Sequence, residues 1–255
     1  MPRRRPLRRL LRGLTLTACL AAAGAGPAAA KDVTIGMGNF APYYIAEGET
    51  GIFIDLIKAV FRRLPDHQPR FLFGRPNKRL WIDFKNGKID AVSNMFGSVE
   101  WQGCRSEPVF RFRDVAVTRA DAGLALKSID DLAGKRIVTF QGAAGFFGPK
   151  FADLDFAKYT EVGKPEIQAR ILYLGRVDVS VGDMFLFLQS VKTSTKPAME
   201  PADFAFHDIL PPTLSRMGFH DRELCLRFDA ALKEVRASGE YERIYQTYLK
   251  QLGAD

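Results

Sequence analysis

One phrase occurs twice in this chain, and it limits the possible folds more than any other feature. "FKNGKIDAVS" occupies residues 84–93, and "LYLGRVDVSV" occupies residues 172–181. Each copy contains a glycine, a basic residue, an aliphatic residue, an aspartate and a short apolar run. Glycine is favoured just past the end of a helix, and a short apolar run predicts a buried strand. Two copies of a helix–Gly–strand step, 88 residues apart, predict two α/β units of similar size.

The segments before each copy follow the same order of elements. "DVTIGMG" at 32–38 and "RIVTF" at 136–140 predict strands. The first is followed by "IFIDLIKAVFRRL", whose apolar residues recur on one face of a helix. The second is followed by a Gly-rich loop and a helix that we expect from about residue 147. "RFLF" at 70–73 predicts another strand. Strands that alternate with helices predict parallel-rich α/β sheets.

The first thirty residues have the composition of an export signal. Six arginines and no acidic residue are followed by an apolar stretch from Gly13, and "AAA" at 28–30 precedes Lys31. These are the three parts of a secretory signal peptide, and the apolar part is too short to predict a membrane span. We expect residues 1–30 to be removed and the protein to reside in the periplasm. A twin-arginine route stays open, as does lipid attachment at Cys19, because "LTAC" resembles a lipobox.

The positive charge of the chain comes mostly from this signal. The full sequence carries +8, and removal of the six signal arginines leaves +2 for residues 31–255. A nucleic-acid-binding protein has a basic patch within its folded part, whereas here basic residues are dispersed among acidic ones. We therefore expect no nucleic-acid partner.

Cys104 and Cys225 remain once the signal is removed. An oxidising compartment permits one disulfide between them. Neither these cysteines nor the three histidines have the close spacing of a metal site, so we expect no metal and no cofactor. The sequence has no Gly-x-Ser-x-Gly motif and no P-loop, which favours a binding protein over an enzyme.

Four further motifs occur in order along the chain. They are "APYYIAEGETGIFIDLIKAVFRRL", "KSIDDLAGKRIVTFQG", "GRVDVSVGD" and "LRFDAALKEVRASGEYERIYQTYL". Together with "FKNGKIDAV" they resemble the periplasmic solute-binding proteins that serve ABC importers of polar amino acids, the bacterial extracellular solute-binding proteins of family 3. The first motif resembles the family's first loop and helix, with Gly51 and Asp55 in place. The second resembles the opening of the second lobe, and the last resembles the closing helices.

The resemblance implies the two-lobed periplasmic binding protein fold (type II), an α/β fold in which two hinge crossings join two parallel-rich sheets. Lobe one comprises residues 31–113 plus 206–255, and lobe two comprises residues 114–205. The resemblance also implies that a small-molecule ligand binds between the lobes and is delivered to an ABC permease in the inner membrane. It implies a monomer.

The resemblance also implies a set of ligand-binding residues. Asp183, which ends "GRVDVSVGD", matches the residue that holds the ligand's amino group, and Phe40 matches an aromatic that stacks on the ligand. Both Cys104 and Cys225 fall in lobe one, where a disulfide would tie a loop to the closing helix. The expected ligand-binding set is Phe40, Tyr44, Asn77, Asn94, Gln102, Arg105, Gln141, Gly142, Ala143 and Asp183.

Three positions depart from the family's pattern. Gln102 replaces the arginine that grips a ligand carboxylate, and Gly97 and Ala143 replace threonines. A guanidinium–carboxylate pair is bidentate and charge-assisted, and a glutamine amide cannot reproduce it. We therefore expect a small polar ligand with a cationic or amine-bearing group, and not a standard α-amino acid held in the usual way. Whether Arg105 replaces the missing arginine is left open.

Two other functions stay open. Some proteins that resemble this family are exported dehydratases of cyclic acids, and Glu100 is the candidate acid or base for such a reaction. The other is a ligand-sensing accessory protein that reports occupancy to a membrane partner. Turnover of cyclic acids would distinguish the first from binding, and the phenotype of a gene deletion would distinguish sensing from transport.

Overall fold

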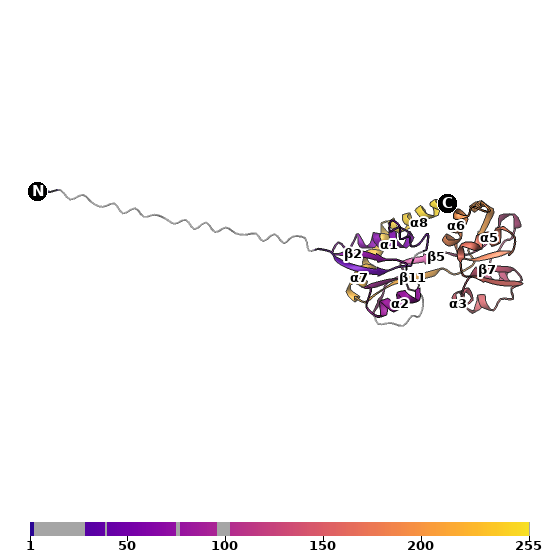
Figure 1. Ribbon diagram of the computed structural model, residues 1–255, viewed down its shortest axis with the longest axis horizontal. Helices are drawn as coiled ribbons and strands as arrows, with labels where there is room; N and C mark the ends of the chain where they lie inside the picture. Colours follow the sequence, from indigo (N-terminus) through magenta and orange to yellow (C-terminus); the bar gives the residue numbers. More distant parts are fainter. Residues whose placement is uncertain (3–28, 39, 75–76, 96–102, 255) are drawn as a thin grey trace.

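The computed structural model describes residues 1–2, 29–38, 40–74, 77–95 and 103–254. Within this part the chain forms two α/β lobes that lie side by side (Figure 1), which confirms the α/β class and the two-lobed architecture. The predictions attached to Cys19, Gly97, Glu100 and Gln102 lie outside the described residues.

The first lobe is built on a six-stranded mixed sheet. Its strand order is β2-β1-β3-β11-β4, and β5 also pairs with β11. β1 is parallel to β2 and β3, whereas β11 is antiparallel to its neighbours. The elements of this lobe are β1 (Lys31–Gly36), α1 (Ile52–Phe61), β2 (His67–Leu72), α2 (Asn77–Lys85), β3 (Ala91–Met95), β4 (Cys104–Arg105), β5 (Phe110–Phe112), β11 (Thr213–Phe219), α7 (Arg222–Ala237) and α8 (Glu240–Gln251).

The second lobe is built on a five-stranded sheet with the order β10-β6-β9-β7-β8. β7 is parallel to β8 and β9, and β6 is antiparallel to β9 and β10. Its strands and α-helices are β6 (Asp114–Arg119), β7 (Arg136–Phe140), α3 (Ala143–Phe147), α4 (Pro149–Ala152), β8 (Lys158–Val162), α5 (Gln168–Tyr173), β9 (Val179–Asp183), α6 (Met184–Thr193) and β10 (Phe204–His207). Short 3-10 helices occupy Ala120–Ala122, Ile129–Leu132, Pro165–Ile167 and Pro201–Asp203.

The repeated phrase forms the same structure in both lobes. Gly87 follows α2 with φ 67° and Gly175 follows α5 with φ 66°, a left-handed conformation that glycine adopts without strain. The aspartate of each copy then accepts a backbone N–H from a neighbouring strand. Asp90 Oδ2 lies 2.8 Å from the Thr34 nitrogen in β1, and Asp178 Oδ2 lies 2.8 Å from the Arg136 nitrogen in β7. The phrase therefore recurs because it forms the same unit in each lobe. In that unit a helix ends at a glycine, and the next strand is held to its neighbour by the aspartate.

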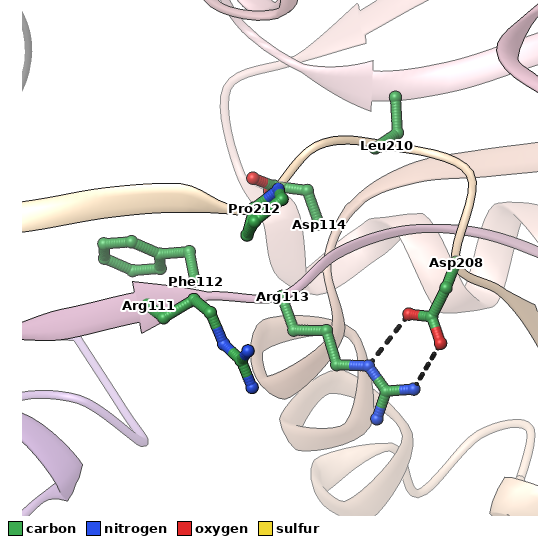
Figure 2. Close-up of a pocket in the computed structure, with 7 residues that line it drawn as sticks. All are labelled: Arg111, Phe112, Arg113, Asp114, Asp208, Leu210 and Pro212. Atoms are coloured by element: carbon green, nitrogen blue, oxygen red, sulfur yellow. Dashed lines mark hydrogen bonds and ion pairs between the residues drawn. The ribbon is translucent and has the colours of Figure 1, made fainter.

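Two crossings join the lobes. One is Arg113, between β5 and β6, and the other is residues 208–212, between β10 and β11. Arg113 forms a bidentate ion pair with Asp208 at 2.9 and 2.6 Å, so a side-chain pair links the two crossings (Figure 2). His207 pairs with Ala116 in the second sheet. We accordingly propose that lobe one resumes at residue 208, two residues later than the sequence indicated.

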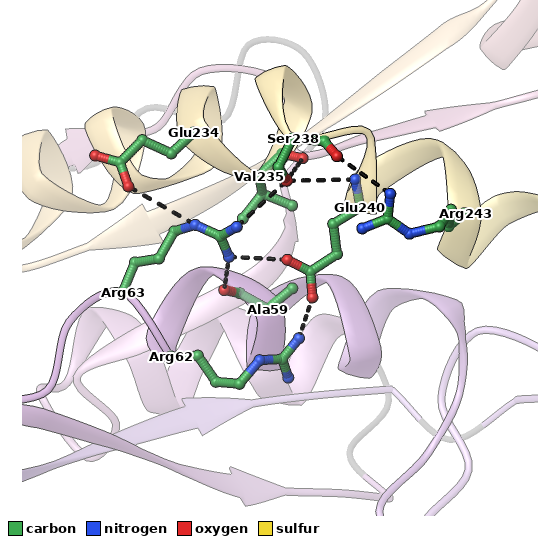
Figure 3. A network of polar contacts seen from close by, with 8 residues as sticks. All are labelled: Ala59, Arg62, Arg63, Glu234, Val235, Ser238, Glu240 and Arg243. Atoms are coloured by element: carbon green, nitrogen blue, oxygen red, sulfur yellow. Dashed lines mark hydrogen bonds and ion pairs between the residues drawn. The ribbon is translucent and has the colours of Figure 1, made fainter.

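The C-terminal helices close the first lobe. Gly239, with φ 73°, separates α7 from α8. The side chains of Arg62 and Arg63 at the end of α1 both pair with Glu240, and Arg63 also donates to the Ala59 carbonyl (Figure 3). Figure 1 shows that α8 ends beside the second lobe, where Lys192 donates to the Gln251 carbonyl at 2.8 Å.

The Gly-rich segment after β7 differs from the prediction. A loop with a helix from about residue 147 was expected, whereas α3 already begins at Ala143 and α4 follows after Gly148. Gly142, with φ 86°, allows the turn into α3, and the alanines that follow have high helix propensity. Gly148 ends α3, and proline at the first position of α4 starts the second short helix.

Among the described residues, no helix combines the length and apolar character that a membrane span needs. The same part of the chain contains no cluster of three or more side chains suited to a metal ion.

A disulfide joins β4 to α7. The Sγ atoms of Cys104 and Cys225 lie 2.12 Å apart and their Cα atoms 6.1 Å apart, across a sequence separation of 121 residues. Cys225 is fully buried. The bond therefore fixes the edge strand of the first sheet to the helix that covers it.

Removal of this disulfide is expected to destabilise the protein. Replacing both Cys104 and Cys225 with serine should lower the free energy of unfolding by about 3–5 kcal/mol, because a long loop is no longer closed in the unfolded state. Chemical denaturation measures the loss relative to the oxidised wild type, and the reduced wild type should show a similar loss. Two titratable thiols in freshly exported, denatured wild-type protein would contradict the expectation.

Candidate ligand-binding site

Asp183 is the centre of the candidate site. It is the last residue of β9 and the N-cap of α6, where its Oδ1 accepts the Leu186 backbone N–H at 2.9 Å. Aspartate is a preferred N-cap because its side chain satisfies an N–H group that the helix leaves unpaired. The residue is only 9% exposed. Local helix capping and burial thus fix the carboxylate in one position.

Tyr43 brings the first lobe into contact with this carboxylate. Its hydroxyl donates to Asp183 Oδ1 at 2.6 Å, from the loop between β1 and α1. The ring is fully buried and packs edge-on against Phe110 and Phe112, and it also contacts Phe185 of α6. This hydrogen bond therefore joins the two lobes beside the first crossing.

The second carboxylate oxygen of Asp183 has no hydrogen-bond partner among the described residues, although it is buried. A buried polar atom without a partner lowers stability by about 1–3 kcal/mol, and more if it is charged. Buried unpaired groups of this kind are rare, and their explanations include strain, a functional role, and a bound water or ion. Oδ2 is thus suited to accept a hydrogen bond from a donor that the described residues do not supply.

Asp114 adds a second buried acid. It lies directly opposite Asp183 in the antiparallel pairing of β6 and β9, and it is 4% exposed. Its Oδ2 accepts a hydrogen bond from the Thr213 hydroxyl at 2.8 Å. Burial raises the pKa of Asp114 to about 6, and the Thr213 hydrogen bond opposes this shift.

Burial also raises the pKa of Asp183, to about 7. The Tyr43 hydrogen bond opposes the rise, and the nearby Asp114 charge adds to it. Burial and the Asp183 charge raise the pKa of the Tyr43 hydroxyl well above its usual value, so Tyr43 stays a donor. In the described part of the chain no basic side chain pairs with Asp183. The site therefore favours a positively charged group, which would stabilise the ionised carboxylate.

The two predicted aromatic residues lie in different environments. Phe40 is partly exposed and packs edge-on against Tyr44, with ring centroids 5.0 Å apart. Tyr44 is fully buried and packs on Phe53 of α1, so in this conformation it belongs to the core of lobe one. Sequence reasoning chose Tyr44 for the site, whereas Tyr43 contacts Asp183. The signal was present as two adjacent tyrosines, but only the fold decides which one points toward lobe two.

The segment from Gln141 to Ala143 lies at the end of β7, next to β9. The Gly142 N–H donates to Glu161 Oε2 at 2.9 Å, and the Tyr159 hydroxyl donates to Glu161 Oε1 at 2.8 Å. The Gly142 N–H, then the Tyr159 hydroxyl, lower the pKa of Glu161 and keep it ionised. Ala143 is buried, and Gln141 is exposed. The N–H group predicted to meet the ligand thus donates to the carboxylate of the exposed Glu161, a contact that the sequence did not predict.

The remaining predicted residues are more dispersed. Arg105 is an exposed residue of β4, where it pairs with Gly218 of β11. Asn77 begins α2 and Asn94 lies in β3. The side chains of both asparagines, and the whole of Gln102, lie outside the described part, so their roles stay predictions. The structure brings together Phe40, Tyr43 and Asp183, with Glu161 at the same end of the second sheet.

Comparison with known proteins identifies the family of the chain. The profile of the bacterial extracellular solute-binding proteins, family 3, matches residues 33–251. No curated protein sequence matches the chain.

Several solved structures share the fold. A probable amino-acid ABC transporter extracellular-binding protein, YtmK from Bacillus subtilis, is 23% identical, with a TM-score of 0.70 over 88% of this chain and 98% of that chain. An ancestral arginine-binding protein bound to arginine is 23% identical, with a TM-score of 0.60 over 85% of this chain and 97% of that one. The GluR0 ligand-binding core from Nostoc punctiforme, in complex with L-glutamate, is 18% identical, with a TM-score of 0.62 over 85% and 98%.

These identities establish the fold, and the profile match covers nearly the whole of both lobes. The chain belongs to the bacterial extracellular solute-binding proteins, family 3.

Proposed function

We propose that this protein is a periplasmic solute-binding protein that captures a small amine-bearing ligand between its lobes and delivers it to an ABC importer. The observation that carries the proposal is the buried Asp183 Oδ2, which has no partner among the described residues. A primary ammonium or guanidinium group supplies the hydrogen-bond donor that this oxygen lacks, and its positive charge balances the ionised carboxylate.

The arrangement around Asp183 supports binding rather than catalysis. One carboxylate oxygen is held by Tyr43 and Leu186, so the orientation of the other oxygen is fixed. Domain closure about the two crossings would then enclose the ligand. We propose that the protein acts as a monomer in the periplasm. A ligand-sensing role with another membrane partner uses the same site, and a dehydratase would need Glu100.

Native mass spectrometry of the purified protein, followed by a calorimetric screen, tests the proposal. The screen covers amino acids, polyamines, betaines and small organic acids. Loss of uptake of the ligand after gene deletion supports transport, whereas loss of a cellular response with uptake intact supports sensing. Turnover of a cyclic acid would identify an enzyme.

Asp183→Ala is expected to weaken binding of the tightest amine-bearing ligand from that screen by about 2–5 kcal/mol, because it removes one partner of a buried charge pair. Gln102→Ala should weaken it by about 1–2 kcal/mol, the range for a lost neutral hydrogen bond. Asp153→Ala, at an exposed position of lobe two, is the matched control. Tight binding of an ordinary α-amino acid that is lost in Gln102→Ala and unaffected in Asp183→Ala would refute this assignment.

The affinity for a cationic ligand is expected to rise with pH through about 7. Asp183 must be ionised to bind a cation, and its pKa lies near 7. Below that value each pH unit should weaken binding up to about tenfold. Tyr43→Phe should move the midpoint upward, because it removes a hydrogen bond that stabilises the ionised carboxylate. Calorimetry between pH 5 and 8 measures the profile, and a flat one in the wild type would count against the role of Asp183.

The unliganded protein is expected to respond in the opposite direction. Asp114 and Asp183 have higher pKa values when folded than when unfolded, so the folded state binds more protons between about pH 4 and 7. The contribution of both groups to stability therefore falls as pH rises through that window. Thermal unfolding of ligand-free protein measures the decline, and Asp183→Asn should reduce it. An undiminished decline in Asp183→Asn would show that other groups cause it.

The mature protein is expected to begin at Lys31, because "AAA" at 28–30 precedes a polar residue and the first strand. The intact mass of the exported protein decides this point. A mass that corresponds to a diacylglycerol group on Cys19 would instead establish a lipoprotein.

A further inference from the structure

Glu161 is an exposed acidic side chain near the end of β8. Its two carboxylate oxygens accept hydrogen bonds from the Gly142 N–H at 2.9 Å and the Tyr159 hydroxyl at 2.8 Å. Gly142 is the residue before α3, and its φ of 86° turns the chain at the end of β7. A carboxylate of the protein itself therefore fills a position that offers a backbone N–H group to an anion.

This carboxylate lies at the same end of the second sheet as Asp183, where the parallel strands have their carboxyl ends. β8, β7 and β9 are adjacent and parallel, and Thr139 pairs with Glu161 on one side and with Val181 on the other. The carboxyl ends of the three strands therefore lie at one end of the sheet. Adjacent strands are about 4.8 Å apart, so the backbones of β8 and β9 are about 10 Å apart. Figure 1 shows α3 on the side of the second lobe toward the first.

The same end of the sheet has a second, independent feature that points to a ligand. Asp183 Oδ2 is buried without a partner among the described residues, in a residue only 9% exposed. A ligand that donates to this oxygen and extends along the carboxyl ends of β7 and β8 would meet Glu161, which is ionised and already accepts the Gly142 N–H. A carboxylate on that ligand would meet a like charge and would find this donor taken.

We propose that Glu161 is a specificity-determining residue that takes the place of a ligand carboxylate in lobe two. The site then selects an amine without a carboxylate over the α-amino acid that has the same side chain. This inference rests on the proposed function, because it assumes that an amine-bearing ligand reaches Asp183. The competing explanation is structural: Glu161 ties β8 to the start of α3 and does not influence the choice of ligand.

A matched pair of probes separates these explanations. Agmatine is arginine without its carboxylate, and cadaverine is lysine without its carboxylate. Calorimetry at pH 7.5 measures the ratio of the dissociation constants of amino acid and amine for each pair. In the wild type we expect each amine to bind at least tenfold more tightly than its amino acid. In Glu161→Gln, which keeps a hydrogen-bond acceptor but loses the charge, we expect this ratio to fall at least tenfold.

The control variant is Glu223→Gln, an exposed position on α7 of the first lobe, which should leave the ratio unchanged. Tyr159→Phe removes one hydrogen bond to Glu161 but keeps its charge, so the amine should still be preferred. An equal change in both affinities of Glu161→Gln would establish the structural explanation and overturn the inference.

The wild-type ratio is a second measurement that does not depend on any variant. Preference of the wild type for arginine and lysine over agmatine and cadaverine would overturn the inference while leaving a solute-binding function intact. If none of the four probes binds, the proposed amine specificity at Asp183 is contradicted and the inference falls with it.

Discussion

The hydrogen bond between Tyr43 and Asp183 is the interaction on which the arrangement of the site depends. It connects a loop of lobe one to the end of a strand in lobe two, over 2.6 Å and 140 residues of sequence. Since Tyr43 is fully buried among aromatic rings from both lobes, the hydroxyl has little freedom to move. Asp183 is held equally firmly by its own helix. One oxygen of the carboxylate is therefore fixed by the protein, and the other is presented in a defined direction.

The Tyr43–Asp183 contact lies next to the two crossings between the lobes. Arg113 and Asp208 link the two crossings to each other, so the crossings are expected to bend together. A ligand shifts the balance between open and closed lobes only if it binds one of these states better. A ligand bound at Asp183 contacts lobe two, and Tyr43 and Phe40 belong to lobe one. Contacts with both lobes are the kind that can favour the closed state.

Sequence patterns predicted the architecture because they report on local structure. The repeated phrase predicted two helix–Gly–strand steps, and Asp90 and Asp178 make equivalent backbone hydrogen bonds in the two lobes. "RIVTF" was predicted as a strand with the bounds that β7 has. The role of Glu161 was not predictable in this way. Its bond to Gly142 spans 19 residues and exists only because β8 lies parallel to β7 in one register. The choice between Tyr43 and Tyr44 likewise depends on how the loop packs between lobes.

The acidic groups are the basis for proposing an amine rather than an amino acid as the ligand. Asp114 and Asp183 are buried on neighbouring strands, and ionising either one within the unliganded protein is unfavourable. Such an arrangement lowers stability, which is a common property of sites that are completed by a ligand. A bound cation supplies the missing charge and donor, and its binding free energy adds to the stability of the folded state. Glu161 adds a third carboxylate at the same end of the sheet. A ligand carboxylate would increase the negative charge there, whereas a cation would reduce it.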